Sequence, residues 1–287
     1  AGATEEFTSG ASPFAAWSTG GNLGTARSTL GGTGTQTAAV VFGGNLGSNT
    51  VTNATEEYGG TSWTAGGNMG TARRGMASAG TQTAALGSGG YIVPATTTNV
   101  TEEYNGTAWT GGGNLGTARY ALAGCGTQTA GLAFGGGQPT KTATEEYNGT
   151  AWTAGGSLTA ARANLAGAGT QTAALAFAGP PASEEYNGTA WTNGGSLNTA
   201  RASLAGAGTQ TAAIAFGGNP GPRQVLTELY DGSSWTNTTP LSTGHYLTSG
   251  AGTQTAALCA GGEAAAETAA TEEFSQFGPE TATIETT

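Results

Sequence analysis

The chain has 287 residues, of which 53 are glycine and only 9% are charged. Its formal net charge is −10 and it has no run of basic residues, which argues against a nucleic-acid-binding surface because such surfaces need clustered Lys and Arg. No stretch approaches the roughly 18 apolar residues of a membrane-spanning helix, so we expect no membrane insertion. The hydrophobic fraction of 37% and the regularly spaced aromatic residues favour a folded repeat over a disordered low-complexity chain.

A Thr-Gln-Thr-Ala motif recurs six times and defines the repeat. Its glutamines are Gln36, Gln82, Gln128, Gln171, Gln210 and Gln254. Successive glutamines lie 39 to 46 residues apart, and the difference falls in one segment between a glycine-bearing pair and the next TEEY-like motif. Outside that segment, 36 residues per unit stay constant. This pattern predicts a rigid scaffold that presents one variable loop per unit.

Each unit is expected to contain four strands. The first runs from the repeat arginine through the small residues, as in 162–169, and the second ends at the glycine pair, as in 172–179. The third is the TEEY motif, as in 144–147, and a two-residue Asn148-Gly149 turn leads to the fourth around Trp152. No helical periodicity interrupts these segments. Four short strands, repeated six times, predict the blades of a propeller.

We therefore predict an all-β, six-bladed β-propeller of four-stranded antiparallel blades, with residues 1–287 as a single domain. The expected units are 18–63, 64–109, 110–152, 153–191, 192–235 and 236–274, with 1–17 needed for closure and 275–287 as a C-terminal tail. Seven TEEY-like motifs accompany only six tryptophans, so the last blade must take its outer strand from the segment around Trp17. We place the C-terminal copy, 271–274, inside the ring. The spare copy, 1–7, could pair with a neighbouring molecule or continue from a preceding domain.

The order of these motifs resembles the kelch repeat: a glycine pair ending one strand, the Tyr of TEEY, a Trp five residues later and then the Arg. The resemblance covers nearly the whole chain, although the units are shorter than the kelch period of about 50 residues. The repeat sequence, TEEYNGTAWTAGG…TARANLAGAGTQTAALAFGG, also resembles Gly/Thr/Ala-rich kelch-like repeats in virion proteins of marine phages. The resemblance implies a virion or other extracellular surface location.

Thirteen of the eighteen acidic residues lie in the TEEY-type motifs, where strand alternation puts the two glutamates of a pair on opposite faces. A carboxylate packed against the next blade needs a partner, and the Arg ten residues beyond each Trp is the candidate. In the sixth unit Leu229 replaces the second Glu and His245 replaces the Arg, as a paired contact would require. The predicted structural pairs are Glu57–Arg73, Glu103–Arg119, Glu146–Arg162 and Glu185–Arg201. The alternative is that these arginines ring a ligand pocket.

No catalytic residues, metal site or cofactor are expected. Kelch-type propellers include copper oxidases, but such a site needs several His and Tyr ligands, and His245 is the chain's single histidine. Asp231 is the single aspartate and takes a turn position held elsewhere by Asn, so Ser-His-Asp catalysis is not supported. Cys125 and Cys259 have no metal-ligand spacing and stand where other units carry small residues, so we interpret them as buried.

The sequence thus predicts a non-enzymatic binding or structural module that uses its variable loops for recognition of a protein or glycan surface ligand. These loops are 45–54, 91–100, 137–143, 180–182, 219–226 and 263–270, and all should emerge on the face that leads into the next Arg. The candidate recognition residues are Tyr91, Ile92, Val93, Pro94, Lys141, Pro180, Pro181 and Arg223. Three alternatives stay open: loops that vary because nothing constrains them, a self-assembling decoration protein of a capsid or fibre that forms homo-oligomers, and a carbohydrate-binding propeller with repeated pockets between blades.

Overall fold

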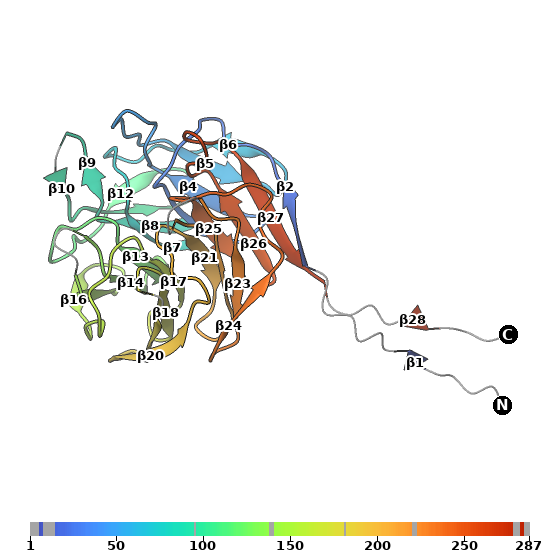
Figure 1. Cartoon of the computed structure of the whole chain (residues 1–287). Helices are drawn as coiled ribbons and strands as arrows, with labels where there is room; N and C mark the ends of the chain where they lie inside the picture. The colour runs from blue at the N-terminus through green and yellow to red at the C-terminus, as the bar shows by residue number, and fades with distance from the viewer. Residues whose placement is uncertain are drawn as a thin grey trace.

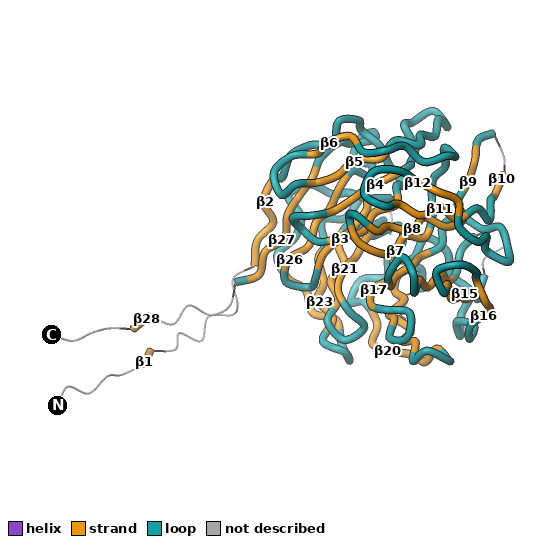
Figure 2. Tube along the Cα trace, turned by 180° about the vertical axis from the view of Figure 1, so that it is seen from behind, coloured by secondary structure: helices purple, strands orange, loops and turns teal. Residues whose placement is uncertain are grey.

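The protein is built from six four-stranded antiparallel sheets arranged around a central axis (Figure 1). The computed structural model describes residues 6–7, 15–94, 96–137, 141–180, 182–219, 223–277 and 282–283. These residues form strands and loops and include no helix (Figure 2). The predicted fold class, a six-bladed all-β propeller with four-stranded blades, is confirmed.

The blades follow one another in chain order, and the first strand of each blade lies nearest the axis. Blade one is β3 (Gly31–Gly34), β4 (Ala39–Phe42), β5 (Thr55–Tyr58) and β6 (Trp63–Ala65). Blade two is β7 (Ala77–Thr81), β8 (Ala84–Ser88), β11 (Thr101–Tyr104) and β12 (Trp109–Gly111), with a small hairpin of β9 (Tyr91–Ile92) and β10 (Thr96–Thr97) in its variable loop. Blade three is β13 (Ala123–Gly126), β14 (Gly131–Phe134), β15 (Thr144–Tyr147) and β16 (Trp152–Ala154).

Blades four and five repeat this pattern. Blade four is β17 (Ala166–Gly169), β18 (Ala174–Phe177), β19 (Ala182–Tyr186) and β20 (Trp191–Ser196). Blade five is β21 (Ala205–Gly208), β22 (Ala213–Phe216), β23 (Thr227–Tyr230) and β24 (Trp235–Thr238). The second strand of each blade is buried on both faces, apart from the first residue of β8 and of β26, because it lies between two strands of its own sheet and between two neighbouring blades.

Blade six joins the two ends of the chain. It consists of β25 (Ser249–Gly252), β26 (Ala256–Ala260), β27 (Thr271–Gln276) and, as its outer strand, β2 (Ala15–Thr19). The pairing of Trp17 with Phe274 confirms the predicted strand exchange and the placement of the C-terminal motif inside the ring. β27 runs two residues beyond the predicted end of that unit. β1 (Glu6–Phe7) pairs with β28 (Ala282–Thr283) of the same chain, and the rest of the spare N-terminal copy lies outside the described residues.

Two local predictions were wrong. The inner strand begins at Ala166 and not at Arg162, because Asn164 has a φ of 54° and this left-handed backbone interrupts the strand. The turn after Tyr147 is a four-residue loop, 148–151, closed between the paired residues Tyr147 and Trp152. Only its Gly149 has a positive φ, while the Asn148 side chain accepts hydrogen bonds from the N–H groups of Thr150 and Ala151. The motif is therefore an Asx-type turn.

The constant glutamine of each unit joins its blade to the preceding one. The Gln128 amide donates to the carbonyls of Ala85 and Tyr104, at 3.0 and 2.7 Å, and so spans two strands of blade two. The corresponding glutamine of each of the other five units makes the same pair of bonds, and Gln36 makes them to blade six, which closes the ring. These bonds explain why the glutamine recurs in every unit.

The tryptophan of each blade also reaches the preceding blade. Trp109 Nε1 donates to the Thr55 hydroxyl at 2.9 Å, and its ring packs edge-on against Phe42 with centroids 4.7 Å apart. The other five tryptophans make the same kind of hydrogen bond to a Thr or Ser of the preceding blade. Large aromatic side chains thus supply the apolar burial that the Gly and Ala strands lack.

Candidate functional site

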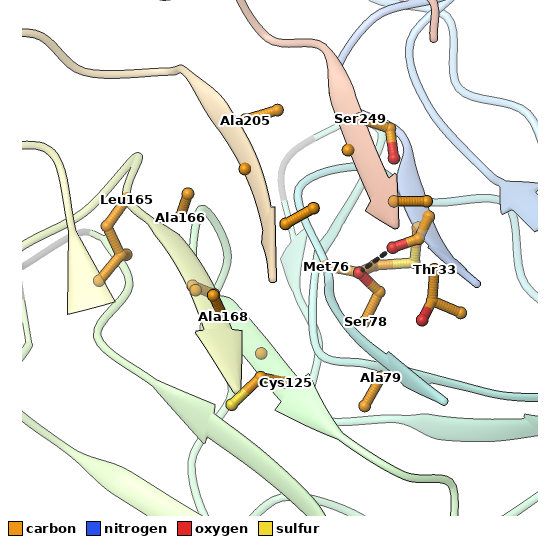
Figure 3. Close-up of a pocket in the computed structure, with 18 of the residues that line it drawn as sticks. Thr33, Met76, Ser78, Ala79, Cys125, Leu165, Ala166, Ala168, Ala205 and Ser249 are labelled. Carbon is orange, nitrogen blue, oxygen red and sulfur yellow. Dashed lines mark hydrogen bonds between the residues drawn. The ribbon is translucent and has the colours of Figure 1, made fainter. Parts of the chain in front are cut away.

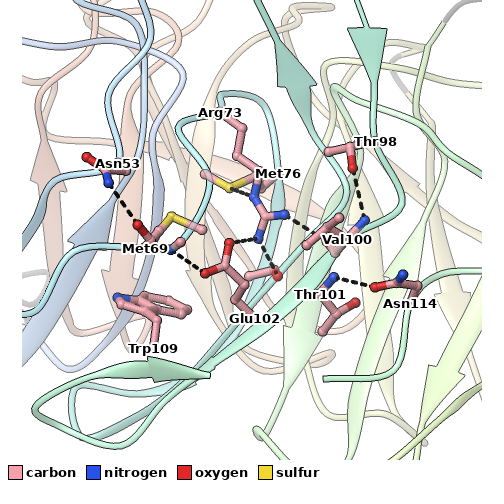
Figure 4. A network of polar contacts seen from close by, with 12 residues as sticks. Asn53, Met69, Arg73, Met76, Thr98, Val100, Thr101, Glu102, Trp109 and Asn114 are labelled. Carbon is pink, nitrogen blue, oxygen red and sulfur yellow. Dashed lines mark hydrogen bonds and ion pairs between the residues drawn. The ribbon is translucent and has the colours of Figure 1, made fainter. Parts of the chain in front are cut away.

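The repeat arginines are buried structural residues, and the predicted pairing of these arginines was wrong. Each ion pair lies within one blade and uses the first Glu of the motif: Arg27–Glu56, Arg73–Glu102, Arg119–Glu145, Arg162–Glu184 and Arg201–Glu228. The Arg73 guanidinium lies 3.3 Å from the Glu102 carboxylate and also donates to the Val100 carbonyl, as Figure 4 shows by dashed lines. Burial lowers the pKa of Arg73 to about 10, although the Glu102 carboxylate acts in the opposite direction. None of these five arginines lines either of the two cavities described below, so they do not ring a ligand pocket.

The second Glu of each motif does face the next blade, as predicted, but its partner is a tyrosine. Tyr104 of blade two donates its hydroxyl proton to Glu57 of blade one at 2.5 Å. Tyr58, Tyr147, Tyr186 and Tyr230 do the same to Glu273, Glu103, Glu146 and Glu185. Burial and the carboxylate together raise the pKa of Tyr104 to about 12. Glu57, Glu103, Glu146 and Glu185 therefore hold blades together without an arginine.

The variable loops all emerge on one face, as predicted, and we call this the loop face. The backbone shows it: Gly44, which precedes the first variable loop, donates to the carbonyl of Arg73 in the next unit at 2.9 Å. The equivalent bond forms in the other five units, to Arg119, Arg162, Arg201, His245 and Arg27. The opposite face, which we call the turn face, carries the hairpins between the first and second strands and the Asx-type turns.

A closed ring of six backbone hydrogen bonds lies on the axis at the loop face. It consists of one residue per blade: Thr29, Gly75, Ala121, Asn164, Ser203 and Leu247. Each N–H donates to the carbonyl of the equivalent residue in the preceding blade, at 2.7 to 2.9 Å, and Thr29 closes the ring onto Leu247. All six have φ between 52° and 65°, although five are not glycine. Such backbone is uncommon outside glycine, so the ring imposes it on every blade.

Beneath this ring a channel runs between the six inner strands, with a cavity of about 280 Å³ (Figure 3). The inner strands are the last in their sheets, so their free backbone edges face the axis. The strands are close enough to require glycine: a Cβ on Gly250 would lie 2.6 Å from the Gly206 carbonyl oxygen. Thr33 and Ser78 add hydroxyls to the wall, and both donate to backbone carbonyls of a neighbouring blade.

A second cavity, which we call the mouth, lies on the loop face and has a volume of about 310 Å³. It shares five of the six ring residues, all but Ser203, with the channel. Beyond them it is lined by Ser28, Asn45, Arg74, Tyr120 and Glu263. The Ser28 hydroxyl, in a residue only 1% exposed, has no hydrogen-bond partner, and neither has Asn45 Oδ1. Both atoms have almost no accessible surface, so they are unsatisfied polar groups of the packing around the mouth and not contacts that a ligand in it could make.

Two guanidinium–tyrosine stacks flank the mouth. Arg74 lies over the Tyr91 ring at 5.2 Å, and Tyr91 in turn packs against Tyr120, with ring centroids 5.5 Å apart. Arg223 lies over the Tyr246 ring at 5.8 Å and forms an ion pair with Glu263 at 3.7 Å. Burial and the Glu263 carboxylate raise the pKa of Tyr246. Aromatic residues and Arg are the types that dominate binding surfaces.

Of the predicted recognition residues that the structure describes, none lines the mouth itself. Tyr91 and Arg223 belong to the two stacks. Ile92 and Val93 are half-buried and Pro94 is exposed, so these apolar candidates are only partly accessible to a ligand. Lys141 and Pro180 are half-buried and do not line the mouth, and Pro181 lies outside the described residues.

Asn45 and Glu263 each begin one of the predicted variable loops, although neither was singled out as a recognition residue. Sequence reasoning missed Ser28, Arg74 and Tyr120. A signal for them existed, because the residue after each constant Arg (or His245) changes from unit to unit. That position holds Ser28, Arg74, Tyr120, Ala163, Ala202 and Tyr246. A position that varies directly beside a constant buried residue indicates an outward-facing side chain on a fixed backbone.

No group of three or more His, Cys, Asp or Glu that could hold a metal occurs among the described residues. Cys125 and Cys259 are buried free thiols, and burial raises the pKa of each to about 12. His245 takes the place of the repeat arginine, 3.5 Å from Glu272. Within the same described ranges, no helix is long and apolar enough to cross a membrane.

Fold and site together define the class of this protein as a six-bladed β-propeller with one variable face, a fold compatible with a binding or structural module. Neither the family models nor the curated proteins with which the chain was compared include a match to it. The resemblance to kelch repeats and to phage virion proteins therefore stays a prediction.

Proposed function

We propose that this protein is a non-enzymatic recognition module of a virion or another extracellular surface, and that it binds its partner through the loop face. One observation carries the proposal: all length variation between units falls on this face, above a scaffold whose glutamine, tryptophan and arginine contacts repeat in unit after unit. A fixed scaffold with one variable face is typical of proteins that change ligand without changing fold. The resemblance to virion proteins of the kelch type supports the surface location.

The side chains of the loop face support binding rather than catalysis. The stacks of Arg74 on Tyr91 and of Arg223 on Tyr246 present rigid aromatic and guanidinium groups, which bind well because they lose little conformational entropy. Among the residues that the structure describes on this face, no nucleophile is paired with a base in the way that covalent catalysis needs.

The test is a binding screen of the purified chain against immobilised cell-surface polysaccharides and surface proteins. A loop-face variant with Arg74→Ala and Arg223→Ala is compared with a turn-face variant with Thr129→Ala and Thr211→Ala, two exposed threonines. We expect the loop-face variant to lose at least about tenfold in affinity for any partner found, and the turn-face variant to bind as the unaltered chain does. Loss in the turn-face variant alone, or a regular self-assembled array with no binding in the screen, would contradict the proposal.

A further inference from the structure

We propose that the closure of the ring is sensitive to pH, because protonation of His245 beside Glu272 strengthens blade six. The inference concerns the joint between the two ends of the chain and does not rest on the proposed function. Of the six described blades, blade six alone is built from both ends of the sequence, with β2 as its outer strand. It is also the blade in which a histidine takes the place of the repeat arginine.

The position of His245 is one that holds a cation in the other five blades. There the guanidinium lies beside the first Glu of the motif and donates to the backbone carbonyl that precedes the motif. Arg119 of blade three, for example, is fully buried, 2.9 Å from Glu145 and 2.8 Å from the Ala143 carbonyl oxygen. The same backbone passes His245, whose carbonyl accepts from Gly218 as the arginine carbonyls accept from the equivalent glycines. Carbonyl oxygens and a carboxylate around one point favour positive charge there.

A neutral imidazole leaves this position unsatisfied. His245 is 1% exposed, and neither of its ring nitrogens has a hydrogen-bond partner. Its Nε2 lies 3.5 Å from Glu272 Oε1, which is within reach of an ion pair. Buried polar groups without partners are costly, so the joint is weaker than its five counterparts while the ring is neutral. A proton makes both nitrogens donors and supplies the charge that the arginines carry elsewhere.

Glu272 keeps its negative charge in the pH range in which an imidazole titrates. Burial works against that charge, but the contact with His245 and hydrogen bonds from the N–H groups of Ser242 and Thr243 outweigh it and lower the pKa of Glu272. A carboxylate that is ionised throughout mild acid is therefore available to pair with the protonated ring.

The other titratable groups near His245 are neutral or already paired. Cys259, which pairs with the first Glu of the blade in the sheet, is a neutral thiol because burial raises its pKa to about 12. Glu273 accepts a hydrogen bond from the tyrosine of blade one, and the arginines of the two neighbouring blades are paired with their own glutamates. The residue after His245 belongs to a separate cluster on the loop face, formed by Arg223, Tyr246 and Glu263.

The location of the pair couples its charge to ring closure. Glu272 belongs to β27, the strand that holds β2, and lies opposite Thr19 of β2. His245 lies just before β25, the inner strand of the same blade. The folded chain offers the imidazole a carboxylate and the unfolded chain does not, so folding takes up a proton. The stabilisation is therefore complete in mild acid and is lost as the pH rises to about 8.

The experiment measures hydrogen–deuterium exchange of the full chain at pH 5.5 and pH 8, expressed as protection relative to the intrinsic exchange rate at each pH. The amides of β2 report closure, and those of β16, the outer strand of blade three, are the internal control. His245→Arg supplies a permanent charge, His245→Gln supplies none, and Glu272→Gln removes the carboxylate. His245 is the single histidine, so no other side chain with an ordinary pKa changes charge in this range.

We expect the protection of β2 to be at least about threefold higher at pH 5.5 than at pH 8, with a melting temperature about 2 °C higher or more, and the protection of β16 to stay constant. His245→Arg should hold β2 at the higher protection at both pH values, and His245→Gln and Glu272→Gln should remove the pH dependence. The inference is overturned if β2 is equally or less protected in acid, if β16 changes as much as β2, or if His245→Gln keeps the dependence. Should a glutamine variant fail to fold, a pH dependence of β2 that persists in His245→Arg overturns it as well.

Discussion

Phe274 and Leu229 replace, at the sixth contact between blades, the tyrosine and glutamate that form a hydrogen bond at the other five. Phe274 has no hydroxyl, and Leu229 of the preceding blade has no carboxylate; Leu229 packs instead against the apolar cluster that contains Phe274. The two substitutions belong together, and the sequence-based pairing of Leu229 with His245 was wrong. His245 stays beside Glu272, the first Glu of its own blade.

This relationship predicts that substitutions at positions 229 and 274 are coupled, so that the second should compensate for the first. Leu229→Glu alone would place a carboxylate in an apolar contact, and Phe274→Tyr alone would bury a hydroxyl without an acceptor, so each should destabilise the fold by about 1–3 kcal/mol. The double variant restores the pair found at the other contacts and should recover most of the loss. Denaturant unfolding of the four proteins in the cycle measures the coupling, and additive losses would show that the two sites are independent.

The buried ion pairs predict which glutamate is coupled to each arginine. Arg119 is fully buried and lies 2.9 Å from Glu145, whereas Glu103 binds Tyr147. Glu145→Leu should therefore cost about 3–5 kcal/mol, because it leaves the guanidinium charge without a partner. Adding Arg119→Leu should recover part of this loss. The same arginine substitution combined with Glu103→Leu serves as the control, and there we expect simple additivity in denaturant unfolding.

Five of the eight tyrosines predict a loss of stability at alkaline pH. Burial and a carboxylate acceptor raise the pKa of Tyr104 from 10.0 to about 12, so folding favours its protonated form. The stabilisation is complete below pH 10 and is lost as the pH rises towards about 12, because only the unfolded chain ionises easily in that range. Absorbance at the phenolate band should rise together with unfolding, and Tyr104→Phe should reduce the steepness of the pH dependence.

The two hydrogen bonds of Gln128 predict that the stability of a Gln128→Glu variant depends on pH. Its amide donates to two carbonyls of the preceding blade, so Gln128→Glu would place a carboxylate against two acceptors with no proton to share between them. We expect a loss of about 1–3 kcal/mol at neutral pH that diminishes in acid, where the protonated carboxyl can donate again. Melting temperatures at pH 7 and pH 4 test this. Gln128→Ala, which cannot titrate, is the control and should show no recovery in acid.

The two buried cysteines allow opening of the fold to be measured by thiol labelling. Cys125 is 7% and Cys259 1% exposed, and burial raises the pKa of each thiol to about 12, so neither forms a thiolate at neutral pH in the folded chain. An aromatic disulfide reagent should label neither thiol in buffer and both in denaturant. Rapid labelling of Cys125 in buffer would mean that the channel wall opens, because this residue lines the channel.

The ring, its six blades and its closure at Trp17 could be predicted because repetition removes ambiguity: a contact that serves one unit must serve all. The side chain with which each glutamate of a unit pairs could not be predicted. Alternation places Glu56 and Glu57 on opposite faces but does not reveal which side chain each one meets. In the structure Glu56 pairs with Arg27 of its own blade, and Glu57 accepts a hydrogen bond from Tyr104 of the next blade. The mouth was missed for a related reason, since Ser28 and Tyr120 gain meaning only when six separate segments converge on the axis.

The closed backbone ring at the mouth has an electrostatic consequence. Its six hydrogen bonds follow one another around the axis, so the components of their peptide dipoles in the plane of the ring largely cancel, unlike the aligned dipoles of a helix end. The scaffold thus contributes little fixed dipole in the plane of the ring. Polarity at the centre of the face is set by replaceable side chains such as Arg74 and Glu263, and substitution can reverse it without disturbing the bonds that close the circle.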